Sequence, residues 1–190
     1  MKHKSKSVAK GGDPRPQRTR QLISSAFVVL LGRRPYDRIR VSDITRKAQI
    51  GRATFYAHFA TKDDLLQAEL ERIVVPMLVA CPGESCPMDC TKLFAHIQHG
   101  RVLYRALMAG STRAVTERLV QDVLEARVCS ILEACGKGVP RAPDFVPRFV
   151  ASTILTLLAW SLEQPLPLAP PALQETFRSL VAGSLGLSRQ

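Results

Sequence analysis

The sequence lacks the long apolar segments of membrane and secreted proteins. In its 190 residues no uninterrupted apolar run reaches the roughly 18 residues that a membrane-spanning helix needs. Its first residues, MKHKSKSVAKGGDPRPQR, are basic, but no apolar segment follows them as in a secretory signal. They also lack the Ser-rich amphipathic character of a transit peptide. We therefore expect a cytoplasmic protein with no membrane partner.

Motifs for catalysis or nucleotide binding are also missing. There is no Gly-rich dinucleotide fingerprint and no Ser/His/Asp spacing, and Gly136-Lys137-Gly138 does not fit the G-x4-G-K-[ST] pattern of a phosphate loop. Convincing period-two alternation, the mark of β-strands, is absent as well. We expect an all-α protein that is not an enzyme and has no cofactor.

Acidic residues are scarce in the first third of the chain. Residues 1–62 hold 15 Lys and Arg but only 3 Asp and Glu, a net charge of +12, whereas residues 63–190 carry a net charge of −1. Such an asymmetry favours a polyanionic partner for the first third, either nucleic acid or an anionic membrane surface. A basic face that is merely solvated is the alternative.

Helical periodicity fills the rest of the chain, in eight segments that would form about eight or nine helices. They are expected near residues 16–31, 41–48, 52–59, 63–75, 91–109, 112–135, 144–164 and 170–185. Ser42 could cap the second helix, and Thr61 with Asp64 forms a capping-box pattern ahead of the fourth. The chain divides into a flexible basic arm (1–15), a three-helix unit (16–62), a connecting helix (63–75) and a larger helical domain (76–190).

The three helices of 16–62, with a tight turn between the second and the third, follow the plan of a helix-turn-helix DNA-binding domain. Such a unit presents the N-terminal residues of its third helix to base edges. Gly51 and Ala53 are small enough to let the backbone approach the groove. Arg52 suits guanine or phosphate, and Thr54 suits a thymine methyl group or phosphate.

The segment PYDRIRVSDITRKAQIGRATFYAHFATKDDLL resembles the N-terminal domain of the tetracycline-repressor (TetR) family of bacterial transcriptional regulators. Its most specific part is Thr54–Phe59, followed by Lys62. The resemblance implies that Phe55 and Phe59 lie in the core. It also implies that Tyr56, and often His58 and Lys62, face DNA phosphates. The DNA-binding residues expected on these grounds are Arg40, Ser42, Gly51, Arg52, Ala53, Thr54, Tyr56, His58 and Lys62.

This sequence departs from the family pattern at several of these positions. Gln49 stands where the family usually has a turn glycine, so we expect a left-handed backbone there. Gly51 and Ala53 replace the usual Ser or Thr and Gly, and Arg40 replaces a frequent phosphate-binding Thr. These differences affect the operator sequence rather than the fold.

The resemblance further implies that the second domain binds a small molecule and forms a homodimer. The family most often works as repressors, released from a palindromic operator by a ligand, here an unknown small molecule. Residues proposed for the pocket wall are Phe94, Ile97, Tyr104, Leu107, Met108, Arg127 and Trp160. Most of these side chains are equally suited to plain core packing.

The segment Phe145–Gln164 is apolar on nearly every face, so it needs cover on several faces. A partner subunit would supply one cover, through a four-helix bundle formed with the helix at 170–185. The interface residues expected are Phe149, Thr153, Leu157, Leu158, Leu173, Phe177 and Leu180. A core helix within one subunit is the alternative.

Cys81, Cys86 and Cys90 cluster in a predicted loop, and His96 and His99 follow. A regulator that responds to thiol oxidation or to a metal through the Cys81–Cys90 loop is therefore a second hypothesis. The cysteine spacing matches no common zinc pattern, and an odd cysteine count argues against a disulfide framework. We expect no metal site.

Overall fold

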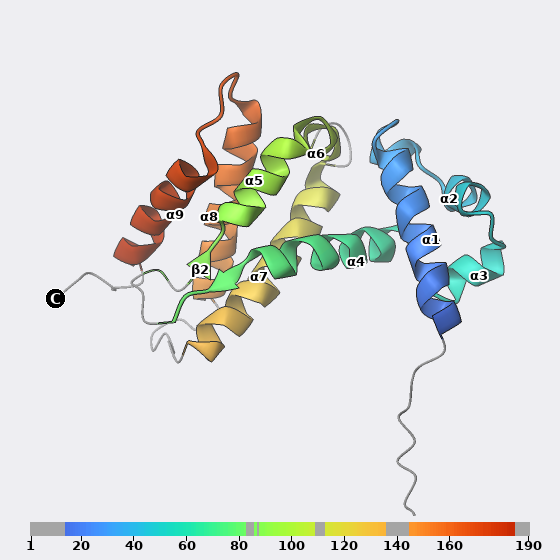
Figure 1. The fold of residues 1–190 in the computed structure, drawn as a ribbon, viewed down its shortest axis with the longest axis horizontal. Helices are drawn as coiled ribbons and strands as arrows, with labels where there is room; N and C mark the ends of the chain where they lie inside the picture. Colours follow the sequence, from blue (N-terminus) through green and yellow to red (C-terminus); the bar gives the residue numbers. More distant parts are fainter. Residues whose placement is uncertain (1–13, 83–85, 87, 109–112, 136–144, 185–190) are drawn as a thin grey trace, which may run out of the picture.

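The computed structural model describes residues 14–82, 86, 88–108, 113–135 and 145–184. In that part of the chain it has nine α-helices, so the predicted all-α fold is confirmed. Most of the predicted arm lies outside the described residues. Figure 1 shows a small group of helices, α1 to α3, at one end and the C-terminal helices at the other, with α4 running between them.

The small group is a three-helix head that follows the helix-turn-helix plan. It consists of α1 (Pro14–Leu31), α2 (Val41–Ala48) and α3 (Arg52–Tyr56), with a short 3-10 helix, η1 (Tyr36–Arg38), between the first two. The long helix α4 (Lys62–Val74) follows and ends in a second 3-10 turn, η2 (Val75–Met77). These bounds lie close to the predicted ones, except that α3 ends before His58.

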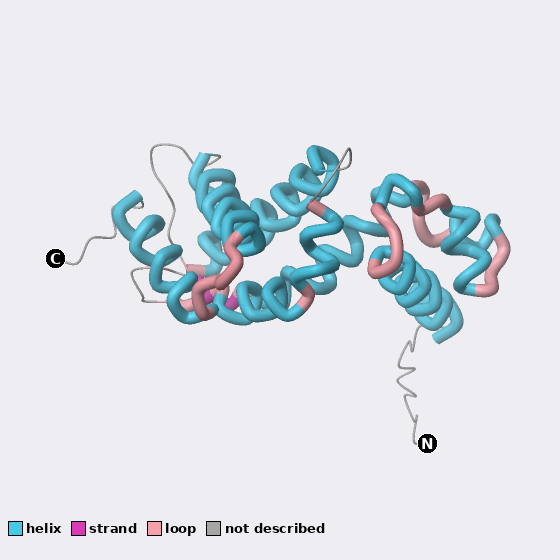
Figure 2. Tube along the Cα trace, turned by 90° about the horizontal axis from the view of Figure 1, so that it is seen from above, coloured by secondary structure: helices cyan, strands magenta, loops and turns pink. Residues whose placement is uncertain are grey.

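The C-terminal helices are α5 (Thr91–His99), α6 (Arg101–Leu107), α7 (Arg113–Ala134), α8 (Phe145–Glu163) and α9 (Pro170–Ser184). Two strands of two residues each, β1 (Val79–Ala80) and β2 (Met88–Asp89), pair antiparallel ahead of α5. Seen from above, the head is set apart from these helices along the long axis of the molecule (Figure 2).

The predicted single helix over residues 91–109 is wrong, because the structure breaks it at Gly100 into α5 and α6. The ring of Tyr104 packs against the Gly100 backbone. A Cβ placed on Gly100 would lie 2.7 Å from Tyr104 Cε2, closer than van der Waals contact allows. A larger residue at position 100 would therefore require the Tyr104 ring to move, a close approach that the periodicity does not reveal.

The core of the head is aromatic and aliphatic. Phe27, Ile44 and Phe55 have no exposed surface, and Phe59 is 4% exposed. The rings of Phe55 and Phe59 lie 5.9 Å apart, and Arg20 stacks over the Phe59 ring. The expected core role of both phenylalanines is confirmed, and their burial fixes which face of α3 points outward.

The prediction for the N-terminal end of α2 is wrong, and the prediction for its C-terminal end is confirmed. The expected cap, Ser42, lies inside the helix, and the N-cap residue is Arg40, whose backbone N–H donates to the Asp43 carboxylate at 3.1 Å. Gln49 ends α2 with φ 56° and ψ 44°, as predicted for a position that the family fills with glycine. The Ile50 N–H donates back to the Thr45 carbonyl at 3.0 Å, which completes a Schellman turn.

Helix α8 is long and apolar enough to cross a bilayer by length and composition alone. Buried residues make up 44% of its apolar window, because α8 packs along α7 within the fold. A buried core helix satisfies the same criteria, so this feature reflects packing inside the domain.

The left-handed backbone of Gln49 predicts that glycine stabilises this turn. The Gln49→Gly variant relieves the contact between Cβ and the carbonyl, so the free energy of unfolding should rise by about 0.5–1 kcal/mol in urea melts. Gln67→Gly, at a helical position of α4, is the matched control and should lower it by about 1 kcal/mol. A Gln49→Gly variant as destabilised as the control would contradict the strain argument.

Candidate nucleic-acid interface and ligand cavity

The third helix presents a polar, accessible face. Gly51 is its N-cap residue, with an extended backbone, and adds no side chain at the helix start. Arg52, Ala53 and Thr54 are exposed, and Tyr56 is 55% exposed, while Phe55 on the opposite face is fully buried. The arrangement places the predicted base-reading residues together on the surface.

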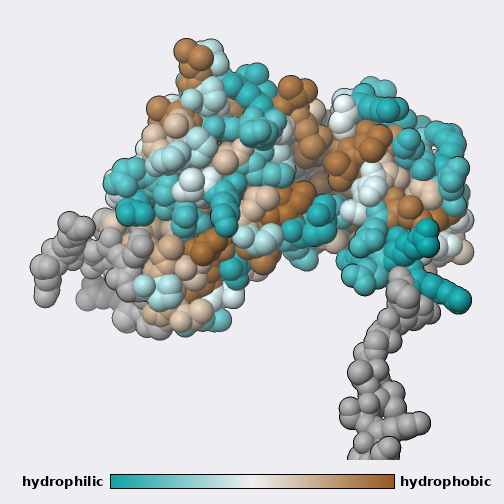
Figure 3. All heavy atoms as spheres, in the orientation of Figure 1, coloured by the Kyte–Doolittle hydropathy of each residue, from teal (hydrophilic) through white to brown (hydrophobic). Residues whose placement is uncertain are grey.

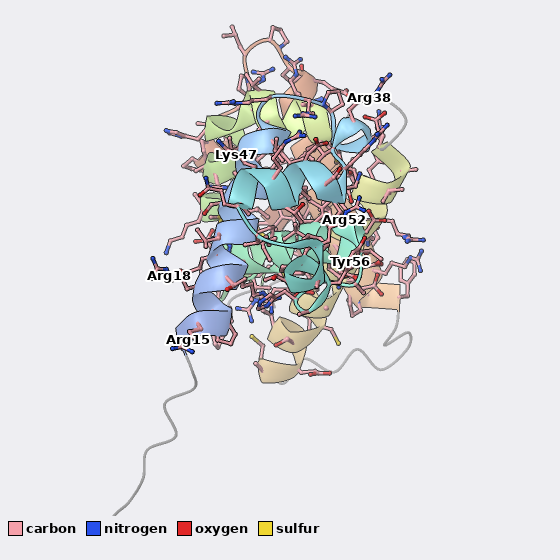
Figure 4. All side chains as sticks on the ribbon, turned by 90° about the vertical axis from the view of Figure 1, so that its right-hand side faces the viewer. Arg15, Arg18, Arg38, Lys47, Arg52 and Tyr56 are labelled. Carbon is pink, nitrogen blue, oxygen red and sulfur yellow. The ribbon has the colours of Figure 1, made fainter. Side chains whose placement is uncertain are left out.

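Cations from three other elements lie around this helix. Figure 4 looks at the head end-on and labels Arg15 and Arg18 of α1, Arg38 of η1 and Lys47 of α2, together with Arg52 and Tyr56 of α3. All six are exposed. The DNA-binding residues expected from the sequence did not include Arg15, Arg18, Arg38 or Lys47. Their grouping depends on how α1, η1 and α2 pack.

The other predicted contacts differ in accessibility. Arg40 is exposed at the start of α2, whereas Ser42 and His58 are half-buried. The His58 ring lies 6.5 Å from the Phe59 ring, between the end of α3 and α4. Arg46 pairs with Asp43 at 2.7 Å, which moderates the positive charge on this side of α2.

Lys62 has a role inside the head that sequence reasoning missed. Its ammonium group donates to the Tyr36 carbonyl at 2.9 Å and to the Ile39 carbonyl at 3.0 Å. It also lies 3.9 Å from the centre of the Tyr36 ring. Burial lowers the pKa of this ammonium group from its usual value. The contacts tie the first turn of α4 to η1.

Tyr36 strengthens the same connection from the other side. Its hydroxyl donates to the Asp63 carboxylate, and its ring packs edge-on against Phe27. Burial, together with this hydrogen bond and the nearby carboxylates, raises the pKa of Tyr36 well above its usual value. We call Tyr36, Lys62 and Asp63 the α4 latch, since together they fasten α4 to the head.

A cavity of about 90 Å³ lies where the head meets the C-terminal helices. Its wall is almost entirely aliphatic and draws on α1, α4, α5, α6, α7 and α8. The lining residues are Val28, Leu31, Leu66, Glu69, Leu70, Ile73, Val74, Leu93, Ile97, Leu103, Tyr104, Leu107, Met108, Thr116, Val120, Leu124, Leu155, Leu158 and Leu162. Sequence reasoning overlooked the walls from α1 and α4, because α1 was assigned to the three-helix unit and α4 to a connecting helix between the two domains.

Four of the predicted pocket residues line this cavity, namely Ile97, Tyr104, Leu107 and Met108. The other three do not. Phe94 is fully buried in the core, and Trp160 is 42% exposed on the outer face of α8. The Arg127 guanidinium donates to the Leu78 carbonyl at 2.9 Å, so it holds the segment after η2.

The polar groups at the cavity wall form hydrogen bonds with neighbouring side chains. Glu69 is 7% exposed and accepts hydrogen bonds from Ser24 on α1 and from Arg72, with a shortest Arg72 contact of 2.7 Å. The Tyr104 hydroxyl lies 2.7 Å from His96 Nε2. Burial raises the pKa of Tyr104 to about 12 and lowers that of His96, so both stay neutral at pH 7.

The predicted dimer residues need correction. Leu157 and Leu158 of α8 and Leu173 and Phe177 of α9 are buried inside one chain, so they cannot form its outer surface. Phe149 and Thr153 are half-buried, and Leu180 is 50% exposed. The side of α8 left uncovered instead carries Phe145, Arg148, Ser152, Thr156 and Trp160, at helical spacing. Three polar residues at helical spacing, Arg148, Ser152 and Thr156, mark this exposed side in the sequence, and the prediction did not use that signal.

The cysteine loop gives no support to a thiol or metal sensor. Cys86 and Cys90 are 1% and 0% exposed, and burial raises the pKa of Cys90 well above its usual value. A buried neutral thiol reacts slowly with oxidants. No group of three metal-binding side chains occurs among the residues that the structure describes.

The three-helix head is similar in sequence to known proteins. Residues 23–68 match the family described as bacterial regulatory proteins, tetR family. A 61-residue stretch is 49% identical to an uncharacterized HTH-type transcriptional regulator, YxbF, of Bacillus subtilis (strain 168). The match covers 32% of this chain and only 16% of that protein's length.

Solved structures resemble the chain over nearly all of its length. A TetR transcriptional regulator from Streptococcus agalactiae 2603V has a TM-score of 0.55 at 23% identity, covering 89% of this chain and 96% of that one. The dihydroxyacetone kinase operon activator DhaS has a TM-score of 0.59 at 18% identity, covering 90% and 98%. A TetR regulator from Rhodococcus sp. RHA1 scores 0.57 at 15% identity, covering 90% and 97%. At these identities the likeness establishes the fold.

The α4 latch predicts that Lys62 acts on stability as well as on any DNA contact. Lys62→Ala leaves the two carbonyls of η1 without their donor, so the free energy of unfolding in urea should fall by about 1–2 kcal/mol. Lys92→Ala, an exposed lysine on α5, should change it by less than about 0.5 kcal/mol. Equal stability of the two variants would remove the structural role of Lys62.

Proposed function

We propose that the chain is a TetR-type transcriptional regulator, a repressor that binds a palindromic DNA operator as a homodimer. We further propose that a small molecule in the cavity between the head and the C-terminal helices releases it from DNA. The observation that carries the proposal is the accessible face of α3, held outward by Phe55 and surrounded by exposed cations.

In the proposed complex α3 enters the major groove. Arg52 and Thr54 contact base edges, and Gly51 and Ala53 let the backbone come close. Tyr56, His58, Arg40 and Ser42 contact phosphates, as do Arg38 and Lys47 on the flanks. Lys62 keeps one donor beyond its two carbonyl contacts, so a phosphate contact is compatible with its role in the α4 latch.

The cavity wall suggests how a ligand bound there would affect the proposed DNA-binding face. Val28 and Leu31 belong to α1, while Leu66 and Leu70 belong to α4, so a bound molecule touches the head itself. The hydrogen bond between Ser24 and Glu69 joins the same two helices. The head and the C-terminal helices could meet at different angles. A ligand that binds more tightly at one of these angles shifts the population of molecules toward it.

A homodimer would place two such heads on one duplex. The uncovered side of α8, from Phe145 to Trp160, supplies one surface for the partner, and Leu180 on α9 supplies another. Small residues at Ser152 and Thr156 allow close helix contact, with aromatic residues at both ends. Two-fold symmetry then matches an inverted repeat with half-sites one or more helical turns apart.

Selection of genomic fragments by the purified chain tests the DNA-binding proposal. Bound fragments should share an inverted repeat, and Arg52→Ala should weaken binding to it by about 1–3 kcal/mol while relaxing the preference at one base position. Arg105→Ala on α6 removes an exposed cation far from α3 and serves as the control. Fragments with no common site would contradict sequence-specific binding.

The Tyr56→Phe variant distinguishes a phosphate contact of Tyr56 from a contact with the bases in the same assay. Loss of a phosphate contact should weaken binding on all sequences alike, without changing the selected repeat. A changed repeat would instead assign Tyr56 to base recognition.

Light scattering on the purified chain tests the subunit contact. Thr156→Arg places a charge in the middle of the exposed side of α8 and should convert a dimer to a monomer of unchanged helicity. Ala126→Arg introduces the same side chain on the exposed side of α7 and should remain dimeric. A monomeric parent chain, or a dimeric Thr156→Arg variant, would rule out this interface.

A further inference from the structure

A second hollow lies beside the cavity, between the head and α6. It has a volume of about 650 Å³ and is formed by the end of α1 with the turn that follows and by the α5–α6 junction. Figure 3 shows the surface hollowed between these two parts, with hydrophobic side chains on both rims. We call it the junction groove; its lining residues are Leu31, Gly32, Arg33, Arg34, Pro35, His99, Gly100, Arg101, Val102, Leu103 and Ala106.

The junction groove is cationic on both sides. Arg33 and Arg34 are exposed on the head side, and Arg101 lies on the opposite side. None of its described lining residues is acidic. Like charges that face one another across a gap repel, and a bound anion relieves that repulsion.

Two of these arginines already have partners that fix their positions. Arg34 lies 3.4 Å from Asp43, and the Arg101 guanidinium donates to the Leu162 carbonyl at 2.9 Å and to the Gln164 carbonyl. The partners of Arg101 are backbone groups, so its charge is not neutralised by them. Its Nε is buried and has no hydrogen-bond partner.

Only a thin partition separates the junction groove from the cavity. Leu31 and Leu103 line both spaces. Gly100 on the groove side touches the ring of Tyr104, which lines the cavity. A nearly pure hydrocarbon wall in the cavity therefore lies directly beside the arginines of the junction groove, with Leu31 and Leu103 between the two spaces.

We propose that the effector is an anionic amphiphile, a carboxylate on an unbranched hydrocarbon chain, with its chain in the cavity and its carboxylate in the junction groove. This inference deepens the proposed function, since it assigns a ligand class to the same cavity. A charged group cannot enter the aliphatic cavity without a large desolvation cost, whereas the chain gains by leaving water there. The cavity of about 90 Å³ is smaller than the roughly 150 Å³ that holds a benzene ring, so it has room for only the first few carbons of a narrow, unbranched chain.

The site would also connect binding to regulation. Arg33 and Arg34 belong to the head, while Arg101 and His99 belong to the C-terminal helices. One carboxylate between them sets the distance between the two parts, and the chain fills the space that both parts enclose. The ligand thus binds best at one angle between head and core, as a population shift requires.

Calorimetric titration of the full chain without DNA tests the ligand class directly. The probes are butanoate, hexanoate, octanoate and 1-octanol, each below its micellar range. Affinity should rise by about fourfold per added methylene until the chain fills the cavity. Octanoate should bind roughly tenfold more tightly than 1-octanol, since the alcohol cannot use the arginines.

Variants distinguish the two halves of the site. Arg33→Gln/Arg34→Gln should weaken octanoate binding about tenfold and leave 1-octanol unchanged. Arg105→Gln, a matched change on α6 outside the groove, should leave both unchanged. Leu155→Phe narrows the cavity and should weaken the binding of octanoate and 1-octanol more than that of butanoate, whose chain is shorter. Circular dichroism melting confirms that each variant is folded.

The inference is overturned if no carboxylate binds, if 1-octanol binds as well as octanoate, or if the double arginine variant behaves like Arg105→Gln. Because no DNA is present, these outcomes leave the proposed operator binding standing. Failure of the genomic selection, in turn, would not alter the titrations.

Discussion

The burial of Phe55 and Phe59 is the constraint on which the rest of this structure depends. Helix α3 has only five residues, too few to be stable alone, so its orientation comes from tertiary packing. With Phe55 fully buried against the core that contains Phe27 and Ile44, the remaining residues of α3 can only face outward. The exposed polar face is therefore a consequence of two apolar side chains on the other side.

The same core extends without interruption into the C-terminal helices through α4. Its first turn is fastened to η1 by the α4 latch, and its middle supplies Leu66, Leu70 and Glu69 to the cavity wall. One helix thus belongs to the structural core of the head and to the enclosure of the cavity. A change at one end cannot leave the other end untouched, because interiors are close-packed.

Local signals in the sequence account for much of this. Strong periodicity gave the helices, the capping-box pattern gave the start of α4 with Thr61 and Asp64, and the family position gave the left-handed backbone at Gln49. These features depend on neighbours in the chain. The exposed residues of α3 followed from the motif, whereas the flanking cations Arg15, Arg18 and Lys47 did not, because their grouping arises from the packing of separate elements.

Other features could not be read from local patterns. The carbonyls that hold Lys62 lie 26 and 23 residues away in the chain. The break at Gly100 depends on where the Tyr104 ring lies, and the face of α8 that stays exposed depends on how α7 covers it. The cavity wall is formed by α1 and α4 together with α5 to α8. A division of the chain into an N-terminal domain and a C-terminal domain therefore leaves part of this wall out of the predicted pocket.

Helix α4 contributes to the core of the head and to the cavity wall. This double contribution determines where the chain could be cut to build a chimeric protein. A fragment that stops at residue 62 would keep α1 to α3 but lose Asp63, Leu65 and Leu66, the last two at most 2% exposed in the whole chain. Its hydrophobic interior would then open to solvent on the side of α1, in a unit already near the lower size limit for independent folding. A fragment that keeps the interior of the head covered therefore ends after α4, at Val75, and carries part of the cavity wall with it.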